Sequence, residues 1–108
     1  MSPELPAAHT IRLGPPWEVA AEAGRVRHAR KFGRPRTLAG DERVRLVFRH
    51  IPGPAEISVN DEPLGSVAAA GPFAADITTR LLTRNSVVVL VTSEELLGLV
   101  VLEINKIF

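Results

Sequence analysis

Apolar and charged residues alternate along residues 43–49, near the middle of the chain. Every second position is apolar and the positions between are mostly arginine, with Val44, Leu46 and Phe48 on one side and Arg43, Arg45 and Arg49 on the other. A period of two is typical of a β-strand that buries one face and exposes the other. The pattern therefore predicts a half-buried strand.

A break and a turn follow this strand. Residues 51–54 read IPGP, and proline cannot continue a β-ladder because it lacks an amide hydrogen and restricts the residue before it. Ile57 and Val59 then repeat the apolar alternation, which indicates a second strand. Asn60 and Asp61 come next, and both residue types tolerate left-handed backbone angles. We expect a tight turn at these two residues.

Further strands are expected on both sides of this central stretch. They cover residues 10–13, 17–22, 25–32, 87–91 and 99–104. Residues 17–22 also have helical propensity, but two prolines before them and Gly24 after them leave too few residues for an isolated helix. We expect a single helical turn within residues 78–83. Because residues 87–91 are almost entirely β-branched, they are predicted to form a central strand covered on both faces.

About eight short strands separated by turn signals predict an all-β fold, an antiparallel β-sandwich. The chain of 108 residues fits one domain. We expect a flexible leader over residues 1–9 and a single β-sandwich domain over residues 10–108. Phe73 and Ile77 are expected to anchor the core, and Leu38 to tuck beneath the sheet. The apolar terminal residue Phe108 is expected either to pack back on the sheet or to contact another subunit.

The first residues lack the basic start and apolar run of a signal peptide. The longest apolar runs, residues 87–91 and 96–102, are well short of the roughly 20 residues that span a bilayer. The chain has no cysteine, so disulfides and thiolate chemistry are excluded. We therefore expect a soluble, cytoplasmic protein that does not associate with membranes.

Charge is distributed unevenly, although the formal net charge is only +1. Arginine and lysine are concentrated in residues 25–49, and most acidic residues come later in the chain. This asymmetry has two interpretations, an anionic partner or opposed charges that meet across neighbouring strands. We favour the second interpretation.

Six blocks of sequence in a fixed order resemble the N-terminal sugar-binding domain of glycoside hydrolase family 2. They are IRLGPPWE at residues 11–18, RVRLVF at 43–48, ISVNDEPLG at 57–65, PFAADIT at 72–78, NSVVVLV at 85–91 and LEI at 102–104. The resemblance implies a galactose-binding-like jelly roll. Asp61 stands where the family usually has glycine, and aspartate should still permit the turn.

The resemblance also implies a binding module without hydrolysis, because family 2 enzymes carry their catalytic glutamates on a separate barrel domain. Asp76 is expected to accept hydrogen bonds from the backbone amides of Thr78 and Thr79, a role in building the fold. Asn60 and Asn85 are likewise expected to serve the turn and the start of a strand.

The residues themselves give no sign of catalysis. Glycoside hydrolysis needs two carboxyl groups across a sugar cleft, but the acidic pairs at residues 61–62 and 94–95 fall in predicted turns. The three histidines, His9, His28 and His50, have no spacing typical of a zinc site. We therefore expect no enzyme activity, no metal and no cofactor.

Two candidate surfaces remain. A carbohydrate site is expected at one end of the sandwich, formed by Trp17, Arg27, Asn60 and Asp76. Trp17, the only tryptophan, is expected to be either its stacking platform or a core or rim residue. The other candidate is a basic face on adjacent strands that would hold polyanions. Its residues are Arg25, Arg27, Arg43, Arg45 and Arg49.

The expected function is weak carbohydrate recognition by a non-catalytic module. The alternative is a protein-interaction or homo-oligomerisation module without a sugar ligand, with the basic face available for polyanions. Nucleic acid is not an expected partner, because readers of single strands combine basic charge with exposed aromatic residues, and that combination is missing here.

Overall fold

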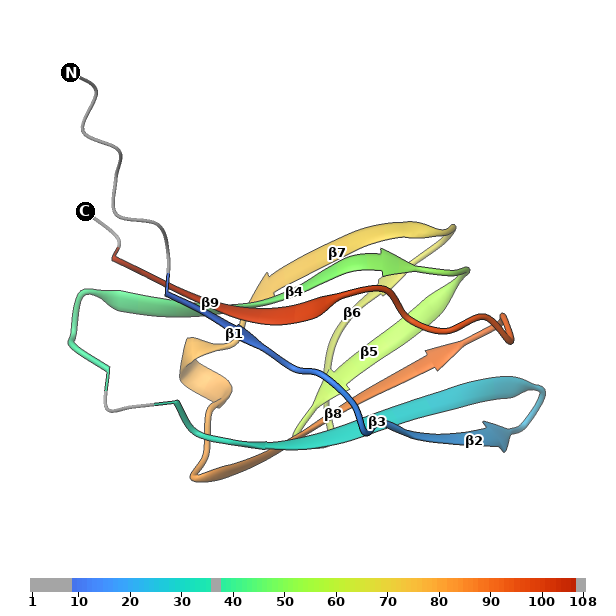
Figure 1. The fold of residues 1–108 in the computed structure, drawn as a ribbon, viewed down its shortest axis with the longest axis horizontal. Helices are drawn as coiled ribbons and strands as arrows, with labels where there is room; N and C mark the ends of the chain where they lie inside the picture. The colour runs from blue at the N-terminus through green and yellow to red at the C-terminus, as the bar shows by residue number, and fades with distance from the viewer. Residues whose placement is uncertain (1–8, 36–37, 107–108) are drawn as a thin grey trace, which may run out of the picture.

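The computed structural model describes residues 9–35 and 38–106. These residues form nine strands and one short 3-10 helix, arranged in two layers (Figure 1). The strands are β1 (His9–Arg12), β2 (Glu18–Glu22), β3 (Arg25–Gly33), β4 (Glu42–Ile51), β5 (Ala55–Val59), β6 (Glu62–Val67), β7 (Gly71–Asp76), β8 (Arg84–Val91) and β9 (Val100–Lys106). The helix is η1 (Thr78–Arg80). The expected helical turn and the strand expected at residues 17–22 are therefore confirmed.

All strand pairs are antiparallel. One sheet has the order β1-β9-β4-β7 and the other has the order β2-β3-β8-β5-β6. The chain passes between the two sheets repeatedly, and two of these crossings are the link from β1 to β2 and the loop from β8 to β9 (Figure 1). The two sheets enclose a core to which both contribute, so the expected all-β sandwich is confirmed.

The alternation of apolar and charged residues over positions 43–49 is reproduced in β4. Val44, Leu46 and Phe48 are completely buried, while Arg43, Arg45 and Arg49 are exposed. The inner face of this strand packs against residues of β8 and β9 in one continuous cluster. Burial of the apolar side chains drives the two sheets together, because the free energy gained is roughly proportional to the apolar area removed from water.

The turn after β5 has the backbone geometry that its residues predicted. Asn60 has φ of 53° and Asp61 has φ of 65°. Left-handed conformation at both central residues is the signature of a type I′ turn, whose twist matches that of a two-stranded hairpin. Asp61 therefore occupies this position where glycine was expected, in the conformation that aspartate tolerates.

The central strand β8 differs from its prediction in one respect. It lies between β3 and β5, and Val87, Val89 and Val91 are completely buried. On the opposite face, Val88 and Leu90 are only half-buried. The expectation that this strand is covered on both faces was wrong, because a two-sheet sandwich covers only the inner face of each sheet.

The segment after β6 supplies the two expected core anchors. Ile77 is completely buried. Phe73 is partly buried and packs against the core, with its ring centroid 6.2 Å from that of Phe48. Leu38 also packs against the core from a partly buried position. Residues 1–8 of the expected leader and Phe108 lie outside the described residues. Within the described part of the chain, no helix is long and apolar enough to cross a membrane.

Candidate functional site

The structure does not gather the four residues of the expected carbohydrate site. Arg27 on β3 lies opposite Leu90 of β8, whereas Asn60 bonds to Ser86, four residues away on β8. That separation corresponds to about 13 Å along a strand. The expectation of one shared site for these four residues is therefore corrected, because the register of β3 and β8 separates Arg27 from the Asn60 turn.

Asn60 uses its side chain within the fold. Its Oδ1 accepts a hydrogen bond from the amide of Ser86 at 2.9 Å. Its Nδ2 donates to the carbonyl of Arg80 at 2.9 Å and to Oδ1 of Asn85 at 3.0 Å. Both ends of the amide group are engaged, which leaves little hydrogen-bonding capacity for a sugar.

Asp76 also acts within the fold. Its Oδ1 accepts a hydrogen bond from the amide of Thr78 at 2.8 Å, which confirms the expected contact to Thr78. The bond holds the start of η1 against the end of β7. Asn60 and Asp76 thus support the same short helix from its two ends, a structural role that both the turn chemistry and the family resemblance indicated.

The expected basic face is divided between the two sheets. Arg25 and Arg27 lie on β3, in the five-stranded sheet, and the other three arginines lie on β4, in the four-stranded sheet. The expectation that all five lie on adjacent strands was wrong. Both strands have one basic side, but each turns that side away from the shared core, so the two basic sides point to opposite surfaces of the sandwich.

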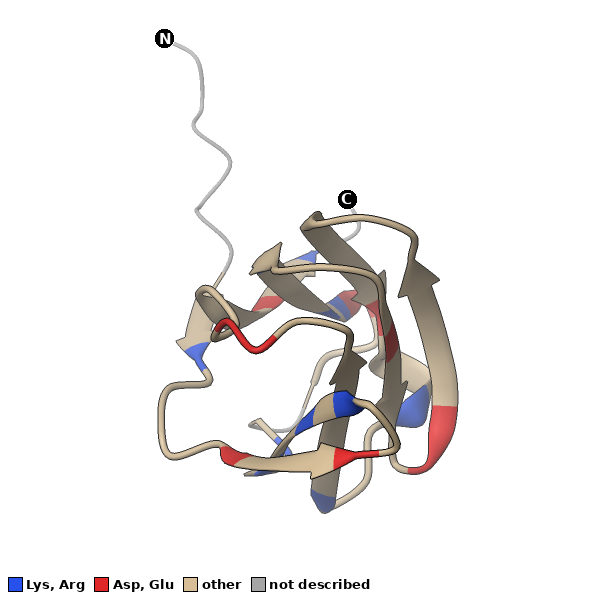
Figure 2. Ribbon diagram, turned by 90° about the vertical axis from the view of Figure 1, so that its right-hand side faces the viewer, with Lys and Arg blue, Asp and Glu red and all other residues tan. Residues whose placement is uncertain are grey.

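Most of these arginines also have acidic partners. Arg25 pairs with Glu56, Arg27 lies 3.9 Å from Glu22, and Arg45 lies 3.7 Å from Glu103, its direct neighbour on β9. Basic and acidic segments occur in both sheets (Figure 2). The interpretation that opposed charges meet across neighbouring strands is therefore confirmed for Arg27 and Arg45, whereas Arg25 reaches across β8 to Glu56 on β5.

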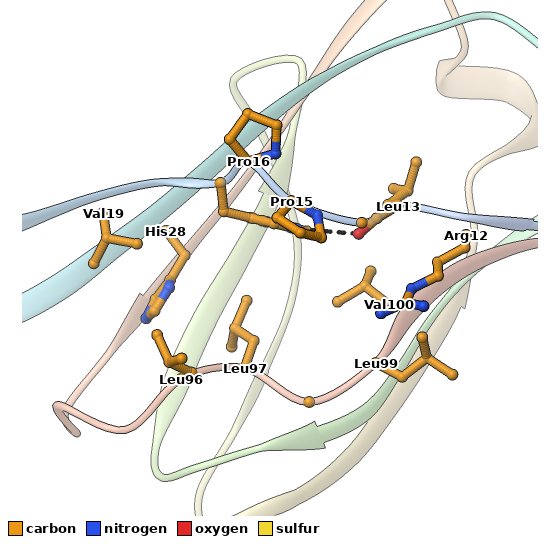
Figure 3. Close-up of a pocket in the computed structure, with 13 residues that line it drawn as sticks. Arg12, Leu13, Pro15, Pro16, Val19, His28, Leu96, Leu97, Leu99 and Val100 are labelled. Carbon is orange, nitrogen blue, oxygen red and sulfur yellow. Dashed lines mark hydrogen bonds between the residues drawn. The ribbon is translucent and has the colours of Figure 1, made fainter.

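A pocket of about 480 Å³ opens where the chain crosses between the sheets. One wall comes from the link between β1 and β2 and the other from the loop between β8 and β9 (Figure 3). The lining is mainly apolar and includes Pro15, Pro16, Trp17, Leu96, Leu97 and Val100. Its volume is in the range of small-molecule sites, which are typically apolar with few polar groups.

Trp17 forms part of this pocket from a half-buried position. Its indole Nε1 donates a hydrogen bond to the carbonyl of Leu13 at 3.1 Å, and its ring packs against the core. Because the only polar atom of the indole is engaged, the ring offers the pocket an apolar surface. Trp17 is thus a rim residue of the core and a wall of the pocket at once.

Three exposed apolar side chains surround the pocket. Among the described residues, the large apolar side chains with substantial exposure are Val19, Leu82, Leu96 and Leu99, of which Leu96 is 75% exposed. All of them except Leu82 line the pocket. Single exposed apolar residues are normal, but a group around one opening indicates a contact surface.

The polar side chains of the pocket are Arg12 and His28. Arg12 is exposed, and no described residue pairs with its guanidinium. His28 is only 2% exposed, and its Nε2 has no hydrogen-bond partner among the described residues. Burial lowers the pKa of His28 below its usual value of 6.5, so the imidazole is neutral at pH 7.

Residues 25–32 alternate so that His28 lies on the side opposite Arg25 and Arg27, but the sequence did not show that a pocket would open beside it. Arg12 and the loop before β9 carried no recognisable signal, because they meet only when the β1–β2 link and the β8–β9 loop lie side by side. Within residues 9–35 and 38–106, no three His, Asp or Glu side chains are grouped so as to hold a metal ion.

No protein-family model matches the sequence, and no curated protein matches it. Similar solved structures exist. A β-glucuronidase from an uncultured Clostridium species matches with a TM-score of 0.79 and 16% identity over 94% of this chain and 30% of that one. A family 2 β-galacturonidase from Eisenbergiella tayi matches with a TM-score of 0.64 and 16% identity over 90% of this chain and 24% of that one.

A β-glucuronidase from Bifidobacterium dentium is 30% identical over 62% of this chain and 11% of that one, with a TM-score of 0.56. The chain thus spans less than a third of the length of each of these three proteins. The likeness concerns one domain of much longer enzymes. The chain has the fold of a domain that occurs in glycoside hydrolase family 2 enzymes, which confirms the resemblance at the level of the fold.

Proposed function

We propose that the chain is a non-catalytic module that recognises carbohydrate at the pocket beside Trp17, with acidic sugars preferred. The observation that carries this proposal is that the indole ring of Trp17 and the unpaired guanidinium of Arg12 line the same pocket. Aromatic rings pack against the apolar faces of sugars, and a guanidinium binds a carboxylate with two parallel hydrogen bonds. The similar structures include enzymes named for glucuronides and galacturonides, which supports a uronic acid as ligand.

The residues of the pocket support binding without hydrolysis. Glycosidases place two carboxyl groups roughly 5 to 9.5 Å apart on either side of the scissile bond. The described residues that line this pocket include no aspartate and no glutamate. A sugar held here therefore meets a cation and apolar walls, with no acid and base pair to cleave it.

Calorimetric titration with methyl glycosides of glucuronic acid, galacturonic acid, glucose and galactose tests the proposal. We expect millimolar binding of the two acidic sugars, weaker binding of the neutral ones, and loss of that difference in Arg12→Ala. Arg43→Ala is the matched control, because Arg43 is also exposed but lies on β4 opposite Asn105 and does not line the pocket. The proposal is wrong if no glycoside binds, or if both arginine variants behave alike.

Self-association is a second candidate, favoured by the exposed Val19, Leu96 and Leu99 around the pocket. A second copy would cover these side chains, as apolar patches do in homodimers. Sedimentation equilibrium should then show a dimer that Leu96→Lys dissociates. Leu82→Lys is the control, because Leu82 is exposed but does not line the pocket. A monomer at all concentrations would exclude this candidate.

A further inference from the structure

His28 has a hydrogen-bonding atom that the fold leaves unused. Its backbone lies in β3, paired with Val19 of β2 and Val89 of β8, and its side chain faces the pocket. The Nε2 atom is shut off from solvent and has no partner among the described residues. Buried polar groups are nearly always paired, and one that is not calls for an explanation.

The surroundings of this imidazole are apolar. Figure 3 shows it extending from β3 toward the loop that carries Leu96 and Leu97, with Val19 on its other side. The cation of the pocket, Arg12, belongs to the opposite end of the lining, beside Leu99 and Val100 (Figure 3). A charged ligand group beside His28 would lose its hydration without gaining a counter-ion, so a neutral group fits better there.

The side chain of Leu96 lies near His28 in the pocket (Figure 3). Leu96 is 75% exposed and lies in the loop between β8 and β9. This loop is fastened at its far end, where the amide of Gly98 donates to the carbonyl of His50 at 2.9 Å and the amide of Arg49 donates to that of Leu99 at 2.8 Å. Exposed side chains change rotamer within nanoseconds, so a ligand can displace the leucine side chain without unfolding the sheet.

We propose that the buried part of the ligand is an aromatic ring carrying one hydroxyl group, and that this hydroxyl bonds to Nε2 of His28. The inference rests on the proposed function in that it uses the same pocket, with the sugar held outside at Arg12. A hydroxyl both donates and accepts, so it satisfies either tautomer of a neutral imidazole. An aromatic ring fits between the indole of Trp17 and the leucines of the loop.

Para-cresol and toluene are suitable probes, because they differ only in the hydroxyl. Toluene is the more hydrophobic of the two, so it should bind more tightly to a pocket that offers no polar contact. If Nε2 of His28 bonds to the hydroxyl of cresol, we expect the opposite order, with cresol bound about tenfold more tightly than toluene. Both affinities can be measured by NMR titration of the unaltered protein at pH 7, and long-range proton–nitrogen spectra of the imidazole report on Nε2 directly.

His28→Leu removes the nitrogen and keeps an apolar side chain of similar volume. In this variant we expect the preference for cresol to disappear while toluene still binds. The inference is overturned if toluene binds the unaltered protein as tightly as cresol, if neither probe binds at millimolar concentration, or if cresol leaves the Nε2 resonance unchanged. The unaltered protein decides these outcomes even if the variant fails to fold.

The two proposals fail separately. Binding of acidic methyl glycosides that depends on Arg12, together with no preference for cresol, would leave the carbohydrate function standing and remove the inference about His28. A preference for cresol that depends on His28, without any binding of glycosides, would support the hydroxyl contact and exclude the proposed carbohydrate function.

Discussion

The side-chain amide of Asn60 donates a hydrogen bond to Oδ1 of Asn85 across 3.0 Å, joining the turn after β5 to the start of β8. Asn85 is 2% exposed, and its Oδ1 also accepts from the amide of Leu82 at 2.8 Å. Its Nδ2 donates to the carbonyl of Leu82 at 2.9 Å. Two asparagines thus tie together the hairpin turn, the segment after η1 and the central strand.

Replacing Asn85 with alanine should destabilise the domain by about 2 to 3 kcal/mol, because it leaves several backbone and side-chain groups unpaired in a buried place. Urea denaturation followed by circular dichroism measures the change. Asn105→Ala is the matched control, since Asn105 is half-buried on β9 and forms no side-chain hydrogen bond within the described part of the chain. Equal losses in the two variants would contradict the role given to Asn85.

Asn60→Gly should cost about 1 to 2 kcal/mol, because glycine keeps the left-handed backbone but loses the three side-chain hydrogen bonds. The double variant with Asn85→Ala should lose less than the sum of the two single losses, since both changes break the same Asn60–Asn85 bond. Strict additivity in the urea experiment would show that this bond contributes nothing to stability.

Gly65→Ala should destabilise the domain by about 1 to 2 kcal/mol through overpacking. A β-carbon at Gly65 would lie 2.8 Å from Cζ of Phe73, closer than carbon atoms can approach. Gly33→Ala is the control, because a β-carbon there meets nothing within 4 Å. Thermal unfolding should show a lower midpoint for Gly65→Ala only. Adding Phe73→Leu to Gly65→Ala should recover part of the lowered midpoint, because it removes the ring that the new β-carbon meets. An unchanged midpoint for Gly65→Ala would refute this packing.

Stability should fall as the pH decreases below about 6.5, with a contribution from His28 of at most about 1.4 kcal/mol per pH unit. Burial lowers the pKa of His28 in the folded state, so below the unfolded pKa the unfolded chain binds a proton that the folded chain does not. This proton uptake favours unfolding until the pH passes the lower, folded pKa. Urea denaturation between pH 5 and 7.5 measures the slope.

His28→Leu should flatten this pH dependence, because the variant has no imidazole at the buried position. His9→Gln is the comparison, since His9 is exposed at the start of β1. A slope that persists in the His28 variant would show that another group is responsible.

Heparin should retain the protein only weakly, with elution below about 0.2 M salt, because the five arginines of the expected basic face are divided between opposite surfaces and three of them have acidic partners. Glu103→Gln frees Arg45 from its partner on β9 and should raise the salt needed for elution slightly. Elution of the unaltered protein at high salt would show that one sheet alone provides a polyanion site.

The sequence by itself determined most of the strands, the inner face of β4 and the turn after β5. The alternation around Val44 placed the core face of β4 correctly, and the chemistry of Asn60 and Asp61 determined the turn, because both signals depend on residues close together in the chain. The same local rules placed Phe73 against the core.

Only the tertiary structure decided which strands share a sheet. Arg27 and Arg45 both lie on the basic side of a strand, but the assignment of β3 and β4 to different sheets follows from long-range pairing that no local pattern records. The pocket has the same origin. Arg12, Trp17 and Leu96 meet because two crossings between the sheets lie together, and the position of a crossing depends on the packing of the whole sandwich.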